Sequence, residues 1–354
     1  MKIVNIEEID KNFSAADWRI AGMKMYDPKE TPFQLHGIFY DGRGYTRLPD
    51  EVAMKVSQGV FDLHRNTAGG RVRFRTDSPY ITVFAKMGSY CDMPHMPRTG
   101  STGFDVYADG IFAGVYRPKK DPNGYGAVVY KKPVMQDIEL NFPTYSDVDT
   151  LYVGLSETAS VETPKPYSIE KPFVYYGSSI TQGGCSSRPG NQYQAYIERA
   201  YDADYLNFGF SGNARGEQAM ADYLAGLSMS FFILDYDHNA RTVEELQSTH
   251  ANFYRTIRAA HPDIPILMLS RPTRDCGEKE SEDRLRVVRD TYETAKKNGD
   301  DNVYFLSGLE LFDAVICPDS CTVDGTHPND LGFYAMAMSI MKLIDREKLF
   351  PRIH

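Results

Sequence analysis

The chain has 354 residues, of which 42% are hydrophobic and 25% charged, which is ordinary for a soluble globular protein and enough for two domains. Its formal net charge of −9 argues against nucleic acid or an anionic membrane surface as a partner. The sequence contains no run of about 18 apolar residues, so it predicts no membrane-spanning helix.

The N-terminus and the cysteines indicate the cellular compartment in which we expect the protein. Residues 1–8 include acidic side chains where a secretory signal peptide needs an apolar segment. We therefore expect a cytoplasmic protein, or an exported one if a signal segment has been removed. The five cysteines are an odd, sparse set that favours reduced thiols over a disulfide framework. Cys317 and Cys321 lie near His327 but lack a second pair, so we expect no metal site and no cofactor.

The first half of the chain, from about residue 15 to 160, contains many short strand patterns separated by Gly and Pro turns. Asp109-Gly110 between two alternating segments is a strong signal for a two-residue hairpin. The series predicts an all-β sandwich, jelly-roll-like, over residues 1–165. The predicted strands are 80–85, 103–108, 111–116 and 136–141.

Three other segments of this half have their own patterns. A helical pattern covers about 50–63. Arginines alternate with apolar or aromatic residues along 71–75, and we interpret them as the solvated face of a strand. Residues 157–170 lack periodicity and predict a linker between two domains.

From residue 171 the pattern changes to short apolar strands that alternate with longer helical segments. This alternation predicts a parallel sheet of about five strands with helices on both faces, over residues 171–354. In such sheets the site lies beyond the carboxyl ends of the strands. The predicted strands are 171–176, 205–206, a run starting at 231, 265–270 and 302–306, and the predicted helices are 191–201, 217–227, 243–261, 280–298 and 331–346.

Residues for hydrolytic chemistry follow these strands. Asp324 precedes His327 by three residues in a turn that opens a predicted helix. An Asp carboxylate can hold an imidazole in one tautomer while the other ring nitrogen faces a nucleophile. Ser179 directly follows the strand pattern at 171–176 and is the candidate nucleophile. The three residues predict a Ser-His-Asp triad.

Candidate groups for binding the substrate lie on the neighbouring strand ends. The backbone N–H groups of Ser179 and Gly212 and the side-chain amide of Asn239 would together form an oxyanion hole. Arg188, on the loop after the nucleophile, and His238 are candidate substrate-binding residues. The sequence favours a solvated or helix-entry role for Arg188, and His238 could equally be structural. We expect both, with Tyr176, at the rim of the pocket, which disfavours a long apolar tunnel.

These segments resemble the SGNH branch of the GDSL esterase/lipase superfamily. Its first block, usually GDSIT, appears here as GSSIT at 177–181, with Ser178 in place of Asp. Its DxxHP block is complete at 324–328, the oxyanion glycine falls on Gly212, and the asparagine block is degenerate around Asn239. The resemblance implies a flavodoxin-like α/β/α hydrolase domain and a serine esterase that uses the triad and oxyanion hole named above.

A second resemblance covers the first half. The sequence TGFDVY at 102–107 looks like the GxDLY signature of a β-rich domain that precedes some SGNH esterase domains, with Val106 in place of Leu. The two-domain layout is similar to that of carbohydrate esterases that remove acetyl groups from polysaccharides. It implies release of short acyl groups, mainly acetyl, from a small-molecule or oligosaccharide ester. A general short-chain acylesterase, a lysophospholipase and a catalytically inactive carbohydrate-binding protein remain alternatives, and the oligomeric state stays open.

Overall fold

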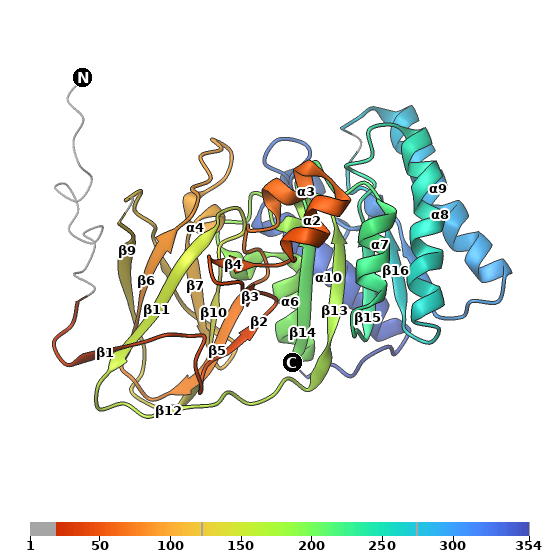
Figure 1. Ribbon diagram of the computed structural model, residues 1–354. Helices are drawn as coiled ribbons and strands as arrows, with labels where there is room; N and C mark the ends of the chain where they lie inside the picture. Colours follow the sequence, from red (N-terminus) through yellow and green to blue (C-terminus); the bar gives the residue numbers. More distant parts are fainter. Residues whose placement is uncertain (1–18, 122, 274, 354) are drawn as a thin grey trace, which may run out of the picture.

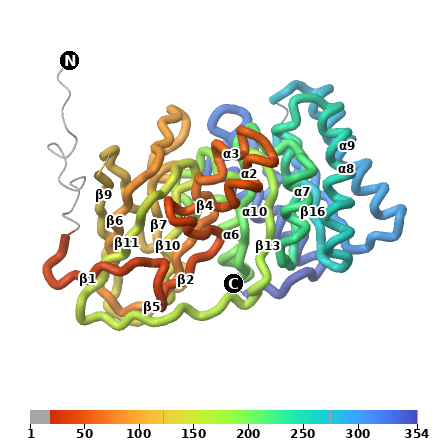
Figure 2. Tube along the Cα trace, in the orientation of Figure 1, coloured from red at the N-terminus to blue at the C-terminus, as the bar shows by residue number. Residues whose placement is uncertain are grey.

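The computed structural model describes residues 19–121, 123–273 and 275–353. Residues 1–8, from which we expect no signal peptide, lie outside these ranges. An antiparallel β domain, here called the leader domain, is followed by an α/β domain, here called the C-terminal domain (Figures 1 and 2). This confirms the predicted fold class. In the described ranges no helix is long and apolar enough to cross a membrane.

The leader domain consists mainly of two antiparallel sheets. Its strands are β1 (Met23–Tyr26), β2 (Gln34–His36), β3 (Phe39–Tyr40), β4 (Tyr45–Thr46), β5 (Arg71–Thr76), β6 (Tyr80–Met87), β7 (Phe104–Ala108), β8 (Ile111–Tyr116), β9 (Tyr125–Tyr130), β10 (Gln136–Asn141), β11 (Val148–Ser156) and β12 (Val161–Glu162). One sheet has the order β1-β11-β6-β9 and the other β12-β5-β10-β7-β8, with β2 beside β5. Side chains from both sheets, such as Phe74, Val83 and Leu140, form one buried core. The predicted hairpin joins β7 to β8, with positive φ at Asp109 and Gly110.

The helical pattern at 50–63 forms two helices instead of one. These are α2 (Asp50–Val56) and α3 (Gln58–Leu63), and Ser57 between them has an extended backbone with φ −172°. The Ser57 side chain accepts a hydrogen bond from the Val60 N–H and so caps α3. Ala53 and Val60 are buried in a core that belongs to the C-terminal domain. In Figure 1, α2 and α3 accordingly lie beside the green strands of that domain.

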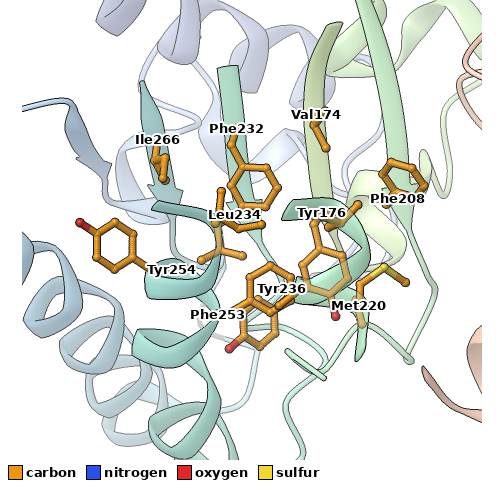
Figure 3. Packing of buried hydrophobic residues seen from close by; sticks show 14 of the residues in the cluster. Val174, Tyr176, Phe208, Met220, Phe232, Leu234, Tyr236, Phe253, Tyr254 and Ile266 are labelled. Carbon is orange, nitrogen blue, oxygen red and sulfur yellow. The ribbon is translucent and has the colours of Figure 1, made fainter. Parts of the chain in front are cut away.

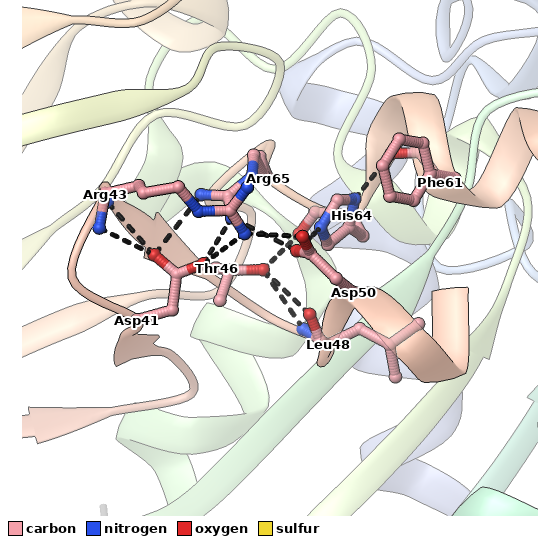
Figure 4. A network of polar contacts seen from close by, with 9 residues as sticks. Asp41, Arg43, Thr46, Leu48, Asp50, Phe61, His64 and Arg65 are labelled. Carbon is pink, nitrogen blue, oxygen red and sulfur yellow. Dashed lines mark hydrogen bonds and ion pairs between the residues drawn. The ribbon is translucent and has the colours of Figure 1, made fainter. Parts of the chain in front are cut away.

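A cluster of charged residues holds this helical segment together (Figure 4). The guanidinium groups of Arg43 and Arg65 both pair with the carboxylates of Asp41 and Asp50. The Nε2 atom of His64, at the end of α3, lies 2.9 Å from Asp50. Hydrogen bonds from Arg43 and His64 lower the pKa of Asp50 to about 2. The cluster therefore ties the start of α2 to the end of α3.

The C-terminal domain contains a five-stranded parallel sheet. Its strands are β13 (Ile169–Gly177), β14 (Ala203–Gly209), β15 (Phe231–Asp235), β16 (Ile266–Leu269) and β17 (Val303–Leu306). Their spatial order is β14-β13-β15-β16-β17, which is the flavodoxin-like order 2-1-3-4-5. In that order, ligands bind where the chain reverses direction across the sheet, between the first and third strands. Here those are β13 and β15.

Helices cover both faces of this sheet. They are α5 (Ser179–Gln182), α6 (Tyr193–Tyr201), α7 (Gln218–Ala225), α8 (Val243–Ala260), α9 (Glu278–Lys297) and α10 (Asp330–Arg346). Residues of α7, α8 and α9 pack on one face, seen in Figure 3, and residues of α6 and α10 on the other. Tyr176, which we expected at the pocket rim, instead lies fully buried on the first face and stacks on Phe253 with 4.7 Å between ring centroids. Its position on β13 turns its side chain into the core.

Arg71 and Arg73 of β5 are buried, contrary to the sequence-based interpretation, whereas Arg75 is half-buried. Arg71 is fully buried and donates hydrogen bonds to Asp204 and to the Tyr205 carbonyl oxygen. Arg73 is 8% exposed, and its guanidinium lies 3.7 Å from the centroid of the Tyr167 ring. The alternation correctly predicted one polar face of a strand, but that face meets the C-terminal domain. Buried ion pairs therefore link the two domains.

Candidate active site

The nucleophile candidate sits in a tight turn from β13 to α5. Ser178 is the N-cap of α5, and its Oγ accepts a hydrogen bond from the Ile180 N–H at 3.1 Å. A Cβ atom on Gly177 would lie 2.1 Å from Thr181 Oγ1, so only glycine permits this close turn. The turn gives adjacent serines different tasks: Ser178 caps the helix, and Ser179 begins it at the carboxyl edge of the sheet.

Ser179, His327 and Asp324 are brought together in one hydrogen-bonded row. Ser179 Oγ lies 2.9 Å from His327 Nε2, and His327 Nδ1 lies 2.8 Å from Asp324 Oδ2. The second carboxylate oxygen of Asp324 accepts the backbone N–H of His327 at 2.8 Å. The carboxylate thus fixes both the backbone and the ring of the histidine. These distances are those of a Ser-His-Asp triad.

The Asp324 carboxyl group is ionised at neutral pH. Burial raises its pKa, but hydrogen bonds from the His327 backbone and ring outweigh this and lower the pKa to about 2. An ionised carboxylate accepts a hydrogen bond from the Nδ1–H of the imidazole. Nε2 then carries the lone pair, and the Ser179 hydroxyl can donate to it. The arrangement therefore prepares His327 to take the Ser179 proton.

The three predicted oxyanion-hole residues follow adjacent strands. Gly177 pairs with Gly209 of β14 on one side and with Asp235 of β15 on the other, which aligns the three strand ends. Among the described residues, the N–H groups of Ser179 and Gly212 have no hydrogen-bond acceptor. Gly212 has φ +67°, and no atom lies within 4 Å of the position that a Cβ would take. Both N–H groups are thus available to a ligand.

The Asn239 side chain is held against the loop that carries Gly212. Its Nδ2 donates a hydrogen bond to the Phe210 carbonyl oxygen at 2.8 Å. A primary amide has two N–H donors, so one remains for a ligand. The contact also fixes the loop that carries Gly212, because the same carbonyl oxygen accepts from Asn213 and Ala214. The degenerate sequence around Asn239 still places an amide donor at this edge.

The His238 side chain is buried near the turn that carries Asp324 and His327. Its side chain is 7% exposed, and Nε2 lies 3.8 Å from Asp275 Oδ2. Burial, assisted by the charge of Arg271, lowers the pKa of His238 to about 3, so the ring is neutral. Neither ring nitrogen has a hydrogen-bond partner in the described chain. A role in substrate binding stays a prediction.

Arg188 contacts the leader domain. Its Nη1 lies 3.1 Å from Asp105 Oδ2 and also donates to the Tyr107 hydroxyl, and its guanidinium covers the Phe112 ring at 3.9 Å. Asp105 additionally accepts the Gly190 N–H at 2.9 Å. Asp105 and Tyr107 are the acidic and aromatic residues of the GxDLY-like signature, so that signature joins the two domains. The structure gives Arg188 this interdomain partner, and its contact with substrate remains a prediction.

Sequence reasoning missed the residues that the leader domain brings to the nucleophile. The Tyr145 hydroxyl donates a hydrogen bond to the Ser179 carbonyl oxygen at 3.2 Å. His95 lies in the segment between β6 and α4 (Arg98–Ser101), and its ring centroid is 5.7 Å from that of His327. Neither residue belongs to a motif of the catalytic half. Only the packing of the two domains places them here.

The parallel sheet, the Ser-His-Asp row at its switch point and the free N–H donors define the fold and site geometry of a serine hydrolase of the α/β/α class. Residues 170–345 match the GDSL-like Lipase/Acylhydrolase family, and residues 23–161 match the GxDLY domain, the N-terminus of SGNH-hydrolase-type esterases. The chain thus belongs to the GDSL-like lipase/acylhydrolase family and is a carboxylic ester hydrolase. Both resemblances predicted from the motifs are confirmed.

Solved structures with the same two-domain arrangement are similar over nearly their whole length. A structure described as a GDSL-like lipase from Bacteroides ovatus has 27% sequence identity and a TM-score of 0.84, covering 94% of this chain and 100% of that chain. The salicylyl-acyltransferase SsfX3 from a tetracycline biosynthetic pathway has 22% identity and a TM-score of 0.77, covering 93% and 99%. A family two carbohydrate esterase from Clostridium thermocellum in complex with cellohexaose has 15% identity and a TM-score of 0.62, covering 89% and 99%. No curated protein matches the sequence.

Proposed function

We propose that this protein is a serine esterase that releases short acyl groups, in the first place acetyl, from O-acylated carbohydrate. The observation that carries the proposal is the row Ser179 Oγ, His327 Nε2, His327 Nδ1 and Asp324 Oδ2, with separations of 2.9 and 2.8 Å. Nucleophile and base within hydrogen-bond reach, with the base oriented by a third group, are the requirements of covalent acyl transfer.

In the first half-reaction, Ser179 Oγ attacks the ester carbonyl carbon while His327 Nε2 takes its proton. The Asp324 carboxylate stabilises the imidazolium that forms. The negative charge on the carbonyl oxygen is met by the N–H groups of Ser179 and Gly212 and by the Asn239 amide. Loss of the Asn239 donor is expected to cost about 2.7–4 kcal/mol of transition-state stabilisation.

The first half-reaction ends when His327 gives its proton to the departing alcohol, and the Ser179 acyl ester remains. In the second half-reaction a water molecule attacks this ester with His327 again as the base. His327 then returns its proton to Ser179 Oγ as the carboxylic acid leaves, which regenerates the enzyme. None of these steps uses a metal ion or a cofactor.

A small acyl group is favoured by the surroundings of the nucleophile. Ser179 is only 8% exposed. Met96, Tyr145 and Cys185 are buried in one cluster, and Tyr145 contacts the Ser179 backbone directly. These side chains restrict the space on the leader-domain side. Tyr176 is buried in the core and does not line this space.

A carbohydrate as the alcohol half is supported by the two-domain layout, which is shared with a carbohydrate esterase solved with cellohexaose. The segment 88–97 of the leader domain reaches the nucleophile and carries the exposed side chain of Met93 and the half-exposed His95. An alcohol bound in front of Ser179 would contact this segment. The leader domain is therefore suited to hold the sugar.

The test is a substrate panel of acetylated oligosaccharides, aryl acetate, butyrate and octanoate esters, and a lysophospholipid. We expect kcat/KM for the aryl acetate at least tenfold above that for the octanoate, a difference of about 1.4 kcal/mol. We also expect acetate release from the oligosaccharide. Ser179→Ala serves as the inactive control on every substrate.

Other results of the panel would select one of the alternatives. Preference for octanoate or lysophospholipid would identify a lipid acylhydrolase. Cleavage of aryl acetates without any sugar ester would leave a general short-chain acylesterase. Sugar binding without cleavage of any ester would point to an inactive carbohydrate-binding protein.

A further inference from the structure

Three metal-ligating side chains from distant parts of the chain meet beside the nucleophile. His95 comes from the leader-domain segment between β6 and α4, Cys185 from the loop after α5, and His327 from the turn before α10. One ligand atom of each lies within 4.8 Å of those of the other two. Within the described ranges, this is the group of His, Cys, Asp and Glu side chains that has metal-site spacing.

We propose that His95, Cys185 and His327 bind one Zn²⁺ ion and that the bound ion inhibits the enzyme. Binding of the ion does not depend on which substrate the enzyme hydrolyses. Inhibition rests on the proposed function, because it requires His327 to act as the base. The ion would therefore be a regulator of the ester hydrolase and not a cofactor.

The ligand set fits zinc. Two imidazole nitrogens and one thiolate occur in zinc sites that keep a fourth position for water. A soft thiolate also favours zinc over magnesium or calcium. In a tetrahedral site with bonds of about 2.0–2.3 Å, ligand atoms on the same ion lie about 3.3–3.7 Å apart. Atoms that now lie within 4.8 Å of one another must therefore move closer, and His95, half-exposed on a loop, has the freedom to do so.

The triad itself prepares His327 as a ligand. Its Nδ1 is bound to Asp324 at 2.8 Å, which leaves Nε2 for coordination. Histidines that bind zinc commonly donate their other N–H to a carboxylate in this way. Nε2 is also the atom that lies 2.9 Å from Ser179 Oγ. An ion on Nε2 thus takes the lone pair that the catalytic base needs.

Cys185 supplies the third ligand as a thiolate. It is 5% exposed and lies in the loop after α5. On binding, the S–H bond breaks, the proton goes to solvent and an S–Zn bond forms, with no change of oxidation state.

The experiment measures both binding and inhibition. Calorimetric titration of Ser179→Ala with ZnCl₂ reports binding without turnover, and we expect one ion per chain. Titration with Co²⁺ should give the near-ultraviolet absorption of a cobalt thiolate. In the wild type, ZnCl₂ should abolish aryl acetate hydrolysis, and a chelator should restore it.

Substitution of the proposed ligands tests whether zinc binds at this position. His95→Ala and Cys185→Ala should each raise the half-inhibitory zinc concentration at least tenfold, relative to each variant's own metal-free rate. Cys185→Ala should also lose the cobalt band. Cys91→Ala and the double variant Cys317→Ala/Cys321→Ala are matched controls outside the group and should retain the wild-type response.

Two results would overturn the proposal. One is zinc inhibition that His95→Ala and Cys185→Ala leave unchanged, and the other is the absence of stoichiometric zinc binding in calorimetry. If the protein hydrolysed no ester at all, the proposed function would fail, but calorimetry and the cobalt band would still decide the metal site. The two failures are thus distinguishable.

Discussion

The Tyr145 hydroxyl of the leader domain donates a hydrogen bond to the carbonyl oxygen of Ser179, 3.2 Å away. The same serine carries the candidate nucleophile and one oxyanion donor. Burial raises the pKa of Tyr145 above its usual value, so the phenol keeps its proton and remains a donor. One hydrogen bond therefore links the β domain to the position of the reacting atoms.

Tyr145→Phe removes only this hydroxyl. We expect kcat for an aryl acetate to fall about three- to tenfold, because a buried hydrogen bond contributes about 0.5–1.5 kcal/mol and the N–H of Ser179 would lose its fixed direction. The KM should change less than kcat. The matched control is Tyr107→Phe, which removes a hydroxyl at the interdomain contact with Gly190. Equal losses in both variants would assign Tyr145 a structural role only.

The two adjacent serines should respond differently to substitution. Ser179→Ala is expected to lower kcat by at least about 10⁴-fold, since loss of a triad nucleophile leaves only binding and the oxyanion hole. Ser178→Ala removes the cap of α5 and should cost about 1 kcal/mol of stability while most activity remains. Steady-state kinetics and thermal unfolding of both variants test this. Loss of activity in Ser178→Ala with retention in Ser179→Ala would mean that the nucleophile is misassigned.

Arg47 should be a major contributor to stability. It is 3% exposed, and its guanidinium donates to the carbonyl oxygens of Asn207, Gly209 and Leu63. Arg47→Met removes all three of these hydrogen bonds, although the Leu63 carbonyl oxygen keeps the Asn66 N–H, and we expect a loss of about 2–5 kcal/mol in the free energy of unfolding.

Urea unfolding of Arg47→Met and Arg43→Met checks this expectation. Arg43 belongs to the surface cluster of Figure 4, and its side chain is 64% exposed. Exposed ion pairs contribute little, so Arg43→Met should unfold like the wild type. Equal effects of the two substitutions would show that burial of Arg47 is not what matters.

Point substitutions test these contacts better than deletion of the whole leader domain would. Ala53 and Val60 of that domain are buried in the core of the C-terminal domain, so a deletion would expose this core.

Because the pKa of Asp235 is raised, we expect the stability of the fold to depend on pH. Burial raises its pKa to about 8, well above the value of about 3.9 in an unfolded chain. Between these values the folded state holds a proton that the unfolded state releases, so stability falls as pH rises, by up to about 1.4 kcal/mol per pH unit. Asp235→Asn has no such proton. The stability of this variant relative to the wild type should therefore rise between pH 5 and 7.

Unfolding of wild type and Asp235→Asn at pH 5, 6 and 7 measures this trend. Thr181 and Tyr193 donate to the Asp235 side chain, and the amide oxygen of asparagine can accept both hydrogen bonds. Asp301→Asn controls for general loss of charge, because that side chain is 96% exposed. A difference between wild type and Asp235→Asn that stays constant across this range would contradict a protonated Asp235.

Local sequence was sufficient for the elements and for choosing the candidate site residues. Strand and helix periods placed β13, β16, β17 and α6 to α10 within about two residues of their observed ends, since these patterns depend on neighbouring residues along the chain. They found only the middle of β14 and the start of β15. The motifs located Ser179, Gly212, Asn239 and the pair Asp324 and His327, because each lies in the turn that directly follows a strand or opens a helix. The parallel order of the strands then required those turns to meet.

What surrounds those residues was decided only by the tertiary structure. The partners of Arg71 and Arg188 come from the other domain, so no period along the chain could tell a buried arginine from a solvated one. His95 and Cys185 reach His327 from segments far away in sequence. The packing of the two domains places His95, and the fold of the C-terminal domain places Cys185. Local propensity is a property of consecutive residues, whereas the burial of a charge depends on a surface that the chain supplies elsewhere.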